Sequence, residues 1–263
     1  MKHSVVAVVV TYNRKNMLEN CIHALQEQTV ACDILIIDNG STDGTEHMIK
    51  NGMLNDVIIY KNTQKNLGGA GGFNYGMKTA MNLGYEYIWL MDDDTYPNTD
   101  ALKKILEADS VLKGKYGFLS SVAYWRDGSV CNMNRQKASL KRVVDSYDEK
   151  LIPVIMATFV SFFVKREIVR QVGYPIKEFF IWSDDLEYSR RISRKYEGYV
   201  VTNSRVLHDM VSNAKVGIEH ETPERLWRYE YLYRNEVYLY RREGLKGMLY
   251  LFMRIVLHLI RVL

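Results

Sequence analysis

Residues 88–95 constrain the chain most, because an apolar run there ends in three consecutive carboxylates, Asp92, Asp93 and Asp94. In an extended backbone successive side chains point to opposite faces, so Asp92 and Asp94 are expected on one face and Asp93 on the other. Two carboxylates on one face at the end of a strand suit Mg²⁺ or Mn²⁺. An isolated acidic triplet is more often a solvated turn. The rest of the sequence is therefore needed to distinguish a metal site from a solvated turn.

Other apolar runs predict the sheet to which this strand belongs. Residues 4–10 and 33–37 are almost continuously apolar and rich in β-branched side chains, which is typical of strands buried on both faces of a parallel sheet. Segments that predict helices alternate with these runs. The alternation predicts an α/β fold with a mostly parallel open sheet flanked by helices. Further strands are expected at residues 57–60, 87–91, 117–123, 154–164 and 199–206, with helices at 165–172 and from 184 onward.

Polar segments follow three of these strands directly. They are residues 11–14 (Thr-Tyr-Asn-Arg), Asp38 and the aspartate triplet. Ligands of open α/β sheets bind beyond the carboxyl ends of the strands. Because the three segments should meet on one rim, the pattern favours a binding site over a solvated turn.

Residues 66–76 form a glycine-rich segment, Asn-Leu-Gly-Gly-Ala-Gly-Gly-Phe-Asn-Tyr-Gly. It matches neither the dinucleotide fingerprint after a first strand nor the Gly-Lys-Ser/Thr of a phosphate-binding loop. Its glycines would let the backbone approach a ligand, and the helix after them would offer N–H groups to an anion. A plain flexible loop explains the same composition equally well.

A second acidic group lies in residues 177–191, where an aromatic loop precedes Asp184 and Asp185. Acids at a helix start are common, because they stabilise the helix dipole. His208 ends the expected strand at 199–206, and a lone histidine is more often structural than a ligand. The pattern of these residues alone leaves both interpretations open.

The C-terminal part predicts two helices, at 223–242 and 245–263, separated by Gly244. In the second helix all cations and the one histidine fall within about 120° of arc: Lys246, Arg254, His258 and Arg261. A basic amphipathic helix is typical of an anchor on anionic lipid, and burial against a partner subunit is the alternative. We expect a catalytic domain at 1–222 and a membrane- or subunit-associating region at 223–263.

The ordered motifs resemble the family-2 glycosyltransferases of the GT-A fold. The matching segments are Val-Val-Thr-Tyr-Asn-Arg, Ile-Asp-Asn-Gly-Ser-Thr-Asp-Gly-Thr, Asn-Leu-Gly-Gly-Ala-Gly-Gly, Leu-Met-Asp-Asp-Asp, Trp-Ser-Asp-Asp-Leu-Glu-Tyr and the later His208. They span about residues 4–210. The glycine-rich segment and the Phe-Phe-Ile-Trp stretch look most like the galactofuranosyltransferase and rhamnosyltransferase branch. Ser183 departs from it, because that branch often has Trp-Asp-Asp without an intervening residue.

The resemblance implies a role for each matching residue. The nucleotide-sugar donor would be held by Thr11, Tyr12, Arg14, Asp38, Asn66 and Asp93. A divalent cation, Mn²⁺ or Mg²⁺, would be held by Asp92, Asp94 and His208. Asp185 would be the catalytic base, while Trp182 and Asp184 would contact donor or acceptor sugar.

The expected activity is a metal-dependent, inverting transfer of a hexose, with galactofuranose a candidate, from a UDP- or dTDP-sugar to a cell-surface glycan. A glucosyl-, galactosyl- or rhamnosyltransferase acting on a glycoprotein or lipid-linked glycan is the alternative within the class. A non-catalytic sugar-binding module is the alternative outside it. The net charge of +4 is too small to predict nucleic-acid binding. Three cysteines without CxxC spacing and no run of 18 uncharged apolar residues favour a cytoplasmic protein, peripheral on the inner membrane face, with a homo-oligomer left open.

Overall fold

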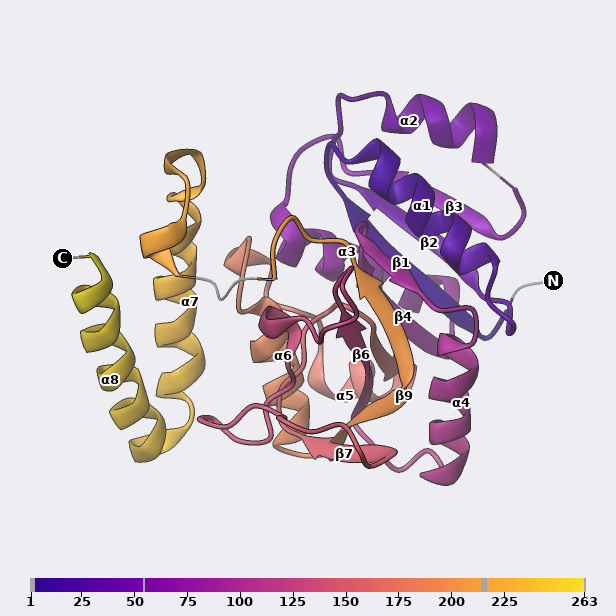
Figure 1. Ribbon diagram of the computed structural model, residues 1–263. Coiled ribbons are helices and arrows are strands. Elements are labelled where there is room, and N and C mark those ends of the chain that lie inside the picture. Colours follow the sequence, from indigo (N-terminus) through magenta and orange to yellow (C-terminus); the bar gives the residue numbers. More distant parts are fainter. Residues whose placement is uncertain (1–2, 54, 214–216, 263) are drawn as a thin grey trace.

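One mixed sheet organises the computed structural model, which describes residues 3–53, 55–213 and 217–262 (Figure 1). Leu263, the last residue of the expected C-terminal helix, lies outside the described residues. The strands are β1 (Val5–Thr11), β2 (Asp33–Asp38), β3 (Ile58–Asn62), β4 (Tyr87–Asp92), β5 (Thr95–Pro97), β6 (Phe118–Tyr124), β7 (Leu151–Val154), β8 (Phe162–Lys165) and β9 (Gly198–His208). They run in the order β3-β2-β1-β4-β8-β6-β9-β5, and β7 also pairs with β9.

The helices connect and cover these strands. They are α1 (Lys15–Gln26), α2 (Thr45–Met48), α3 (Gly68–Leu83), α4 (Ala101–Val111), α5 (Arg166–Val172), α6 (Asp184–Ser193), α7 (Arg228–Arg241) and α8 (Gly244–Val262). Short helical turns are η1 (Ile49–Met53), η2 (Asn132–Asn134), η3 (Lys177–Phe179), η4 (Ile218–His220) and η5 (Pro223–Arg225). None of the helices in the described part of the chain is both long and apolar enough to cross a membrane.

The first half of the sheet is parallel, as the sequence predicts. β3, β2, β1 and β4 all pair in parallel, and every residue of β1 and β2 is buried. Strand registers place Thr11 opposite Asp38 and Val10 opposite Asp92. The carboxyl ends of the three strands therefore meet at one edge of the sheet, as expected.

The second half of the sheet is mixed and differs from the expectation in two places. Residues 154–164 are not one strand, because β7 pairs with β9 whereas β8 lies between β4 and β6. The chain has to cross the sheet between them and cannot stay extended. The three-residue strand β5 was not expected either; it pairs antiparallel with β9 and places Thr95 opposite His208.

Helices cover both faces of the sheet and give it two cores. Side chains of α1 and α4 pack on one face with Ala7, Val9 and Trp89, and those of α3, α5 and α6 pack on the other with Val8 and Leu90. α7 and α8 stand beside this body, with α7 on the inner side (Figure 1). A small cluster of Met156, Leu239, Tyr240 and Leu251 joins them to it.

Candidate active site

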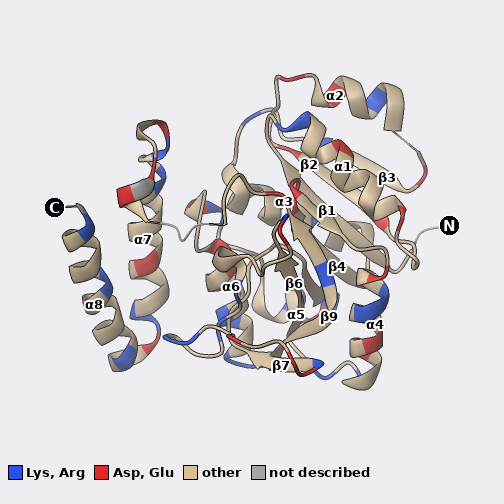
Figure 2. Cartoon of the chain, in the orientation of Figure 1, with Lys and Arg blue, Asp and Glu red and all other residues tan. Residues whose placement is uncertain are grey.

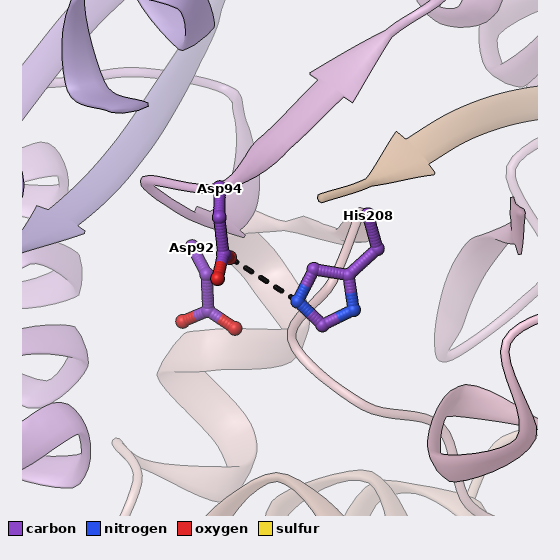
Figure 3. A group of neighbouring side chains, drawn as sticks. All are labelled: Asp92, Asp94 and His208. Atoms are coloured by element: carbon purple, nitrogen blue, oxygen red, sulfur yellow. Dashed lines mark hydrogen bonds and ion pairs between the residues drawn. The ribbon is translucent and has the colours of Figure 1, made fainter. Parts of the chain in front are cut away.

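An aspartate turn and a histidine from the far strand form the centre of the candidate site. β4 ends at Asp92. The next two residues, Asp93 and Asp94, form a turn, after which β5 pairs with the end of β9. His208 Nε2 lies 3.1 Å from Asp94 Oδ1 (Figure 3). One ligand atom from each of Asp92, Asp94 and His208 lies within 4.8 Å of the others. The structure therefore brings together the three residues expected to hold a metal, although through a turn and not through strand alternation.

Burial and charge set the protonation of this cluster. Burial and the neighbouring Asp94 raise the pKa of Asp92 to about 7. Burial alone would raise the pKa of Asp94, but hydrogen bonds and charge from His208 and Arg14 lower it. Burial would lower the pKa of His208, yet Asp94 raises it to about 10. The cluster thus places three acidic side chains beside two basic ones, Arg14 and His208.

Two carboxylate oxygens and one imidazole nitrogen are a chemically suitable set of donors for a divalent transition-metal ion. Their mutual distances allow one ion to touch all three. The imidazole is also held at its other nitrogen, because His208 Nδ1 lies 2.8 Å from Asn134 Oδ1. Asn134 Nδ2 in turn donates to Thr158 Oγ1 at 3.1 Å, which fixes the orientation of the amide. The residues present therefore fit a bound cation.

Asp93 accepts hydrogen bonds from the first polar segment, residues 11–14. Thr11 Oγ1 donates to Asp93 Oδ2 at 2.7 Å. Arg14 Nη1 donates to Asp94 Oδ2 at 2.6 Å and to Asp93 Oδ1 at 3.2 Å. Arg14 therefore ties the first loop to the aspartate turn from outside, and about half of its side chain remains accessible.

The other residues expected to bind the nucleotide lie on the same rim in different environments. Asp38 is fully buried and accepts hydrogen bonds from Tyr60 Oη (2.6 Å) and from the backbone N–H of Ser41 (2.8 Å). Tyr12 is exposed. Asn66 Oδ1 accepts from the N–H of Gly68 at 2.8 Å. Asp38 and Asn66 therefore accept hydrogen bonds from the backbone of their own loops, whereas the side chain of Tyr12 is accessible to solvent.

The glycine-rich segment serves close packing. It is helical from Gly68, so the flexible-loop alternative is wrong. A Cβ on Gly72 would lie 2.5 Å from Val10 Cγ1, and one on Gly68 would lie 2.1 Å from the carbonyl oxygen of Phe180. That carbonyl accepts from the N–H of Ala70, which occupies one donor of the helix start. The glycines bring α3 against β1 and against the aromatic loop that precedes α6.

This aromatic loop carries the second acidic pair. Phe180, Trp182 and Ser183 have positive φ, near +63°, which is costly for residues other than glycine. Burial, followed by the charge of Asp185, raises the pKa of Asp184 well above its ordinary value; Asp92 contributes too, so the acidic groups interact. Removal from water raises the pKa of Asp185 to about 6. Burial thus favours the neutral form of both acids and does so more strongly for Asp184.

Asn235 holds the aromatic loop in place. Its amide nitrogen lies 3.0 Å from the carbonyl oxygen of Phe179, 3.1 Å from that of Ile181 and 2.8 Å from that of Trp182. The indole of Trp182 packs edge-on against Tyr229, at 5.1 Å between ring centres. Sequence analysis missed Asn235 and Asn134, because neither stands in a motif and only the folded chain brings them to the site.

Comparison with known proteins is consistent with this geometry. A family model described as glycosyl transferase family 2 matches residues 6–173. The chain is 27% identical over 269 residues to galactofuranosyltransferase GlfT1 of Mycolicibacterium smegmatis, an alignment that covers 93% of this chain and 85% of that protein. It is 28% identical over 272 residues to GlfT1 of Mycobacterium tuberculosis, covering 95% of this chain and 86% of that protein.

Solved structures share the fold. GalNAc-T7, crystallised with UDP, GalNAc and Mn²⁺, superposes with a TM-score of 0.62 at 16% identity over 78% of this chain. TarS 1–349 of S. aureus in complex with UDP superposes with a TM-score of 0.60 at 17% identity over 90% of this chain. The chain spans 44% and 65% of those two structures. At such identities the likeness establishes the GT-A fold.

Proposed function

The chain belongs to glycosyl transferase family 2 and is a glycosyltransferase, and from this premise we propose that it transfers a sugar from UDP to a glycan hydroxyl with inversion and with the help of a divalent cation. The observation that carries the proposal is the convergence of Asp92, Asp94 and His208 within 4.8 Å. The charge of Asp92 also acts on Asp184, which adjoins the proposed base. A cation site and a base next to one another are what such a transfer requires.

The cation would be held by Asp92, Asp94 and His208, and when bound it would stabilise negative charge on the departing diphosphate. Thr11 and Arg14 position Asp93, which is proposed to face the ribose or the sugar. Tyr12, with Asp38 and Asn66 shaping the rim around it, is proposed to complete the donor site. Arg14, whose side chain is about half exposed, is also proposed to contact the donor.

Asp185 is proposed to accept the proton of the acceptor hydroxyl as that oxygen attacks the anomeric carbon. A base works best when its pKa is near the working pH, and the pKa of Asp185 is raised to about 6. Protonated Asp184 would donate a hydrogen bond to a sugar hydroxyl. Trp182, held by Asn235 and Tyr229, would stack on a sugar face and help to exclude water.

Galactofuranose is the donor sugar we propose, because relatives that cover most of the chain bear the name galactofuranosyltransferase. Mn²⁺ is favoured over Mg²⁺, since one of the three donors is an imidazole nitrogen. The acceptor is proposed to be a growing cell-surface polysaccharide, with transfer at the cytoplasmic side of the membrane. A galactosyl-, glucosyl- or rhamnosyltransferase using the same site remains the second candidate.

A panel of sugar nucleotides tests these assignments. Purified protein is incubated with UDP-galactofuranose, UDP-galactopyranose, UDP-glucose and dTDP-rhamnose, each with Mn²⁺, with Mg²⁺ and with chelator, and release of the nucleotide diphosphate is measured. We expect the fastest release from UDP-galactofuranose with Mn²⁺ and almost none with chelator. If the nucleotide diphosphate is released fastest from another donor, that donor replaces UDP-galactofuranose in the proposal. Equal release in chelator would remove the cation from the mechanism.

A further inference from the structure

The outward face of α8 is apolar and exposed. Leu245 is 90% exposed, Phe252 63% and Ile260 65%. Exposed side chains of the same kind fill the face between them: Met248, Leu249, Met253, Ile255, Val256, Leu257 and Leu259. At 100° per residue these positions occupy about 200° of the helix circumference. No acidic residue occurs in α8.

Three of the four residues of the basic arc of α8, Arg254, His258 and Arg261, contact acidic side chains of the protein, contrary to the expectation that the arc would lie toward lipid. Arg254 Nε donates to Glu236 Oε2 at 2.8 Å, and His258 Nε2 lies 3.1 Å from the same oxygen. Arg261 lies 3.7 Å from Glu219. Buried Glu236 holds Arg254 and His258 against the protein, because a carboxylate out of water needs a partner. The apolar side therefore becomes the outer face.

Other cations lie at one end of this face. The exposed residues Lys141, Arg142, Arg241, Arg242 and Lys246 form what we call the basic rim. Figure 2 shows Lys and Arg at the turn between α7 and α8 and on the loop that reaches toward it. Leu140 of that loop packs on the cluster of Leu239 and Leu251. Glu243, the acid within the turn, points inward and pairs with Arg190 and Arg194.

We propose that the outer face of α8 and the basic rim dock on an anionic lipid bilayer, with α8 lying along the surface. A wide apolar arc suits immersion in the interface, which covers the flanks of a helix as well as its crest. Packing against one helix of a second copy would cover only a narrow stripe. A second copy would also bring no exposed acid of α8 to the basic rim, whereas anionic headgroups complement it.

Flotation of the full-length protein tests the proposal. Vesicles of phosphatidylcholine alone and of phosphatidylcholine mixed with phosphatidylglycerol are compared at low and at high salt. Three variants are matched: Leu249→Glu with Phe252→Glu on the apolar face, Arg241→Ser with Arg242→Ser and Lys246→Ser on the rim, and Val111→Glu as a control at an exposed apolar position of α4. Thermal unfolding of each variant confirms that it is folded.

We expect the wild type and the Val111→Glu control to float, more strongly on anionic vesicles. The apolar-face variant should stay at the bottom with both lipids. The rim variant should lose about fivefold in partitioning per cation, on the order of a hundredfold for three, on anionic vesicles only. A wild type that floats on neither lipid would overturn the proposal. Dimers that the apolar-face variant disperses, seen by light scattering, would then assign this face to a second copy.

Discussion

We propose that Asn134 orients His208 for binding the cation. Its carbonyl oxygen holds Nδ1 of the imidazole, and Thr158 prevents the amide from turning over. A proton on Nδ1 that is donated to Asn134 would leave Nε2 as the nitrogen that binds the cation once its own proton is lost. Partners of this kind orient metal-binding histidines, and their loss lowers metal affinity by about 10- to 100-fold.

Asn134→Ala should therefore weaken Mn²⁺ binding by about that factor while the protein remains folded. Asn132→Ala is the matched control, because Asn132 lies in the same turn and its side-chain amide donates to the carbonyl oxygen of Asn213, away from His208. Calorimetric titration with Mn²⁺ in the presence of UDP measures both variants. Unchanged affinity in Asn134→Ala would mean that His208 needs no partner or is not a ligand.

Asp185→Asn keeps the shape of the proposed base and removes its ability to accept a proton. Sugar transfer should slow by about 10²- to 10⁴-fold, and the affinity for UDP should be kept. In the wild type the rate should fall as the pH drops through about 6, because protonated Asp185 cannot act as a base. The pH–rate profile of the mutant should lack this limb.

Asp184→Asn is the companion variant. Since burial raises the pKa of Asp184 well above its ordinary value and so favours its neutral form, the neutral amide is a mild replacement. A smaller loss of rate is expected than for Asp185→Asn. A larger loss of rate in Asp184→Asn than in Asp185→Asn would identify Asp184 as the base.

At the scale of elements, α7 supports the loop that carries the acidic pair. Asn235 is fully buried and bridges three carbonyls of a backbone with three left-handed residues. Asn235→Asp has the same shape but cannot donate, so it should cost about 1–3 kcal/mol of stability. The loss should also lower the rate constant of transfer more than it raises the KM for donor. Thermal unfolding and steady-state kinetics measure the two effects; a destabilised variant with normal kinetics would give Asn235 a structural role only.

The parallel half of the sheet could be predicted from the sequence, because strands buried on both faces leave continuous apolar runs such as residues 4–10. The mixed half could not, since β7, β8 and β9 are defined by which strands they pair with. Asp92, Asp94 and His208 carry recognisable chemistry in family order. Asn134 and Asn235 were missed because their roles depend on contacts with residues distant in sequence.

At the scale of the whole molecule, we propose that α7 belongs with the catalytic unit and that α8 is the separable part. The expected division placed both helices in one region at 223–263. A chain ending at residue 222 should neither bind UDP normally nor transfer sugar, because the aromatic loop loses Asn235. A chain ending at residue 244 should retain both activities and lose vesicle binding, since Glu236 would reach water when α8 is absent. Assays of UDP affinity, transfer and flotation on both chains check this division, and an active chain ending at 222 would contradict it.

The central claim is that Asp92, Asp94 and His208 hold the cation through which the donor nucleotide binds. Calorimetric titration of UDP into the wild type and Asp94→Ala, each with Mn²⁺ and with chelator, tests it most directly. We predict that Mn²⁺ tightens UDP binding to the wild type and makes no difference to Asp94→Ala. Equal affinity of the wild type for UDP in Mn²⁺ and in chelator would contradict the claim.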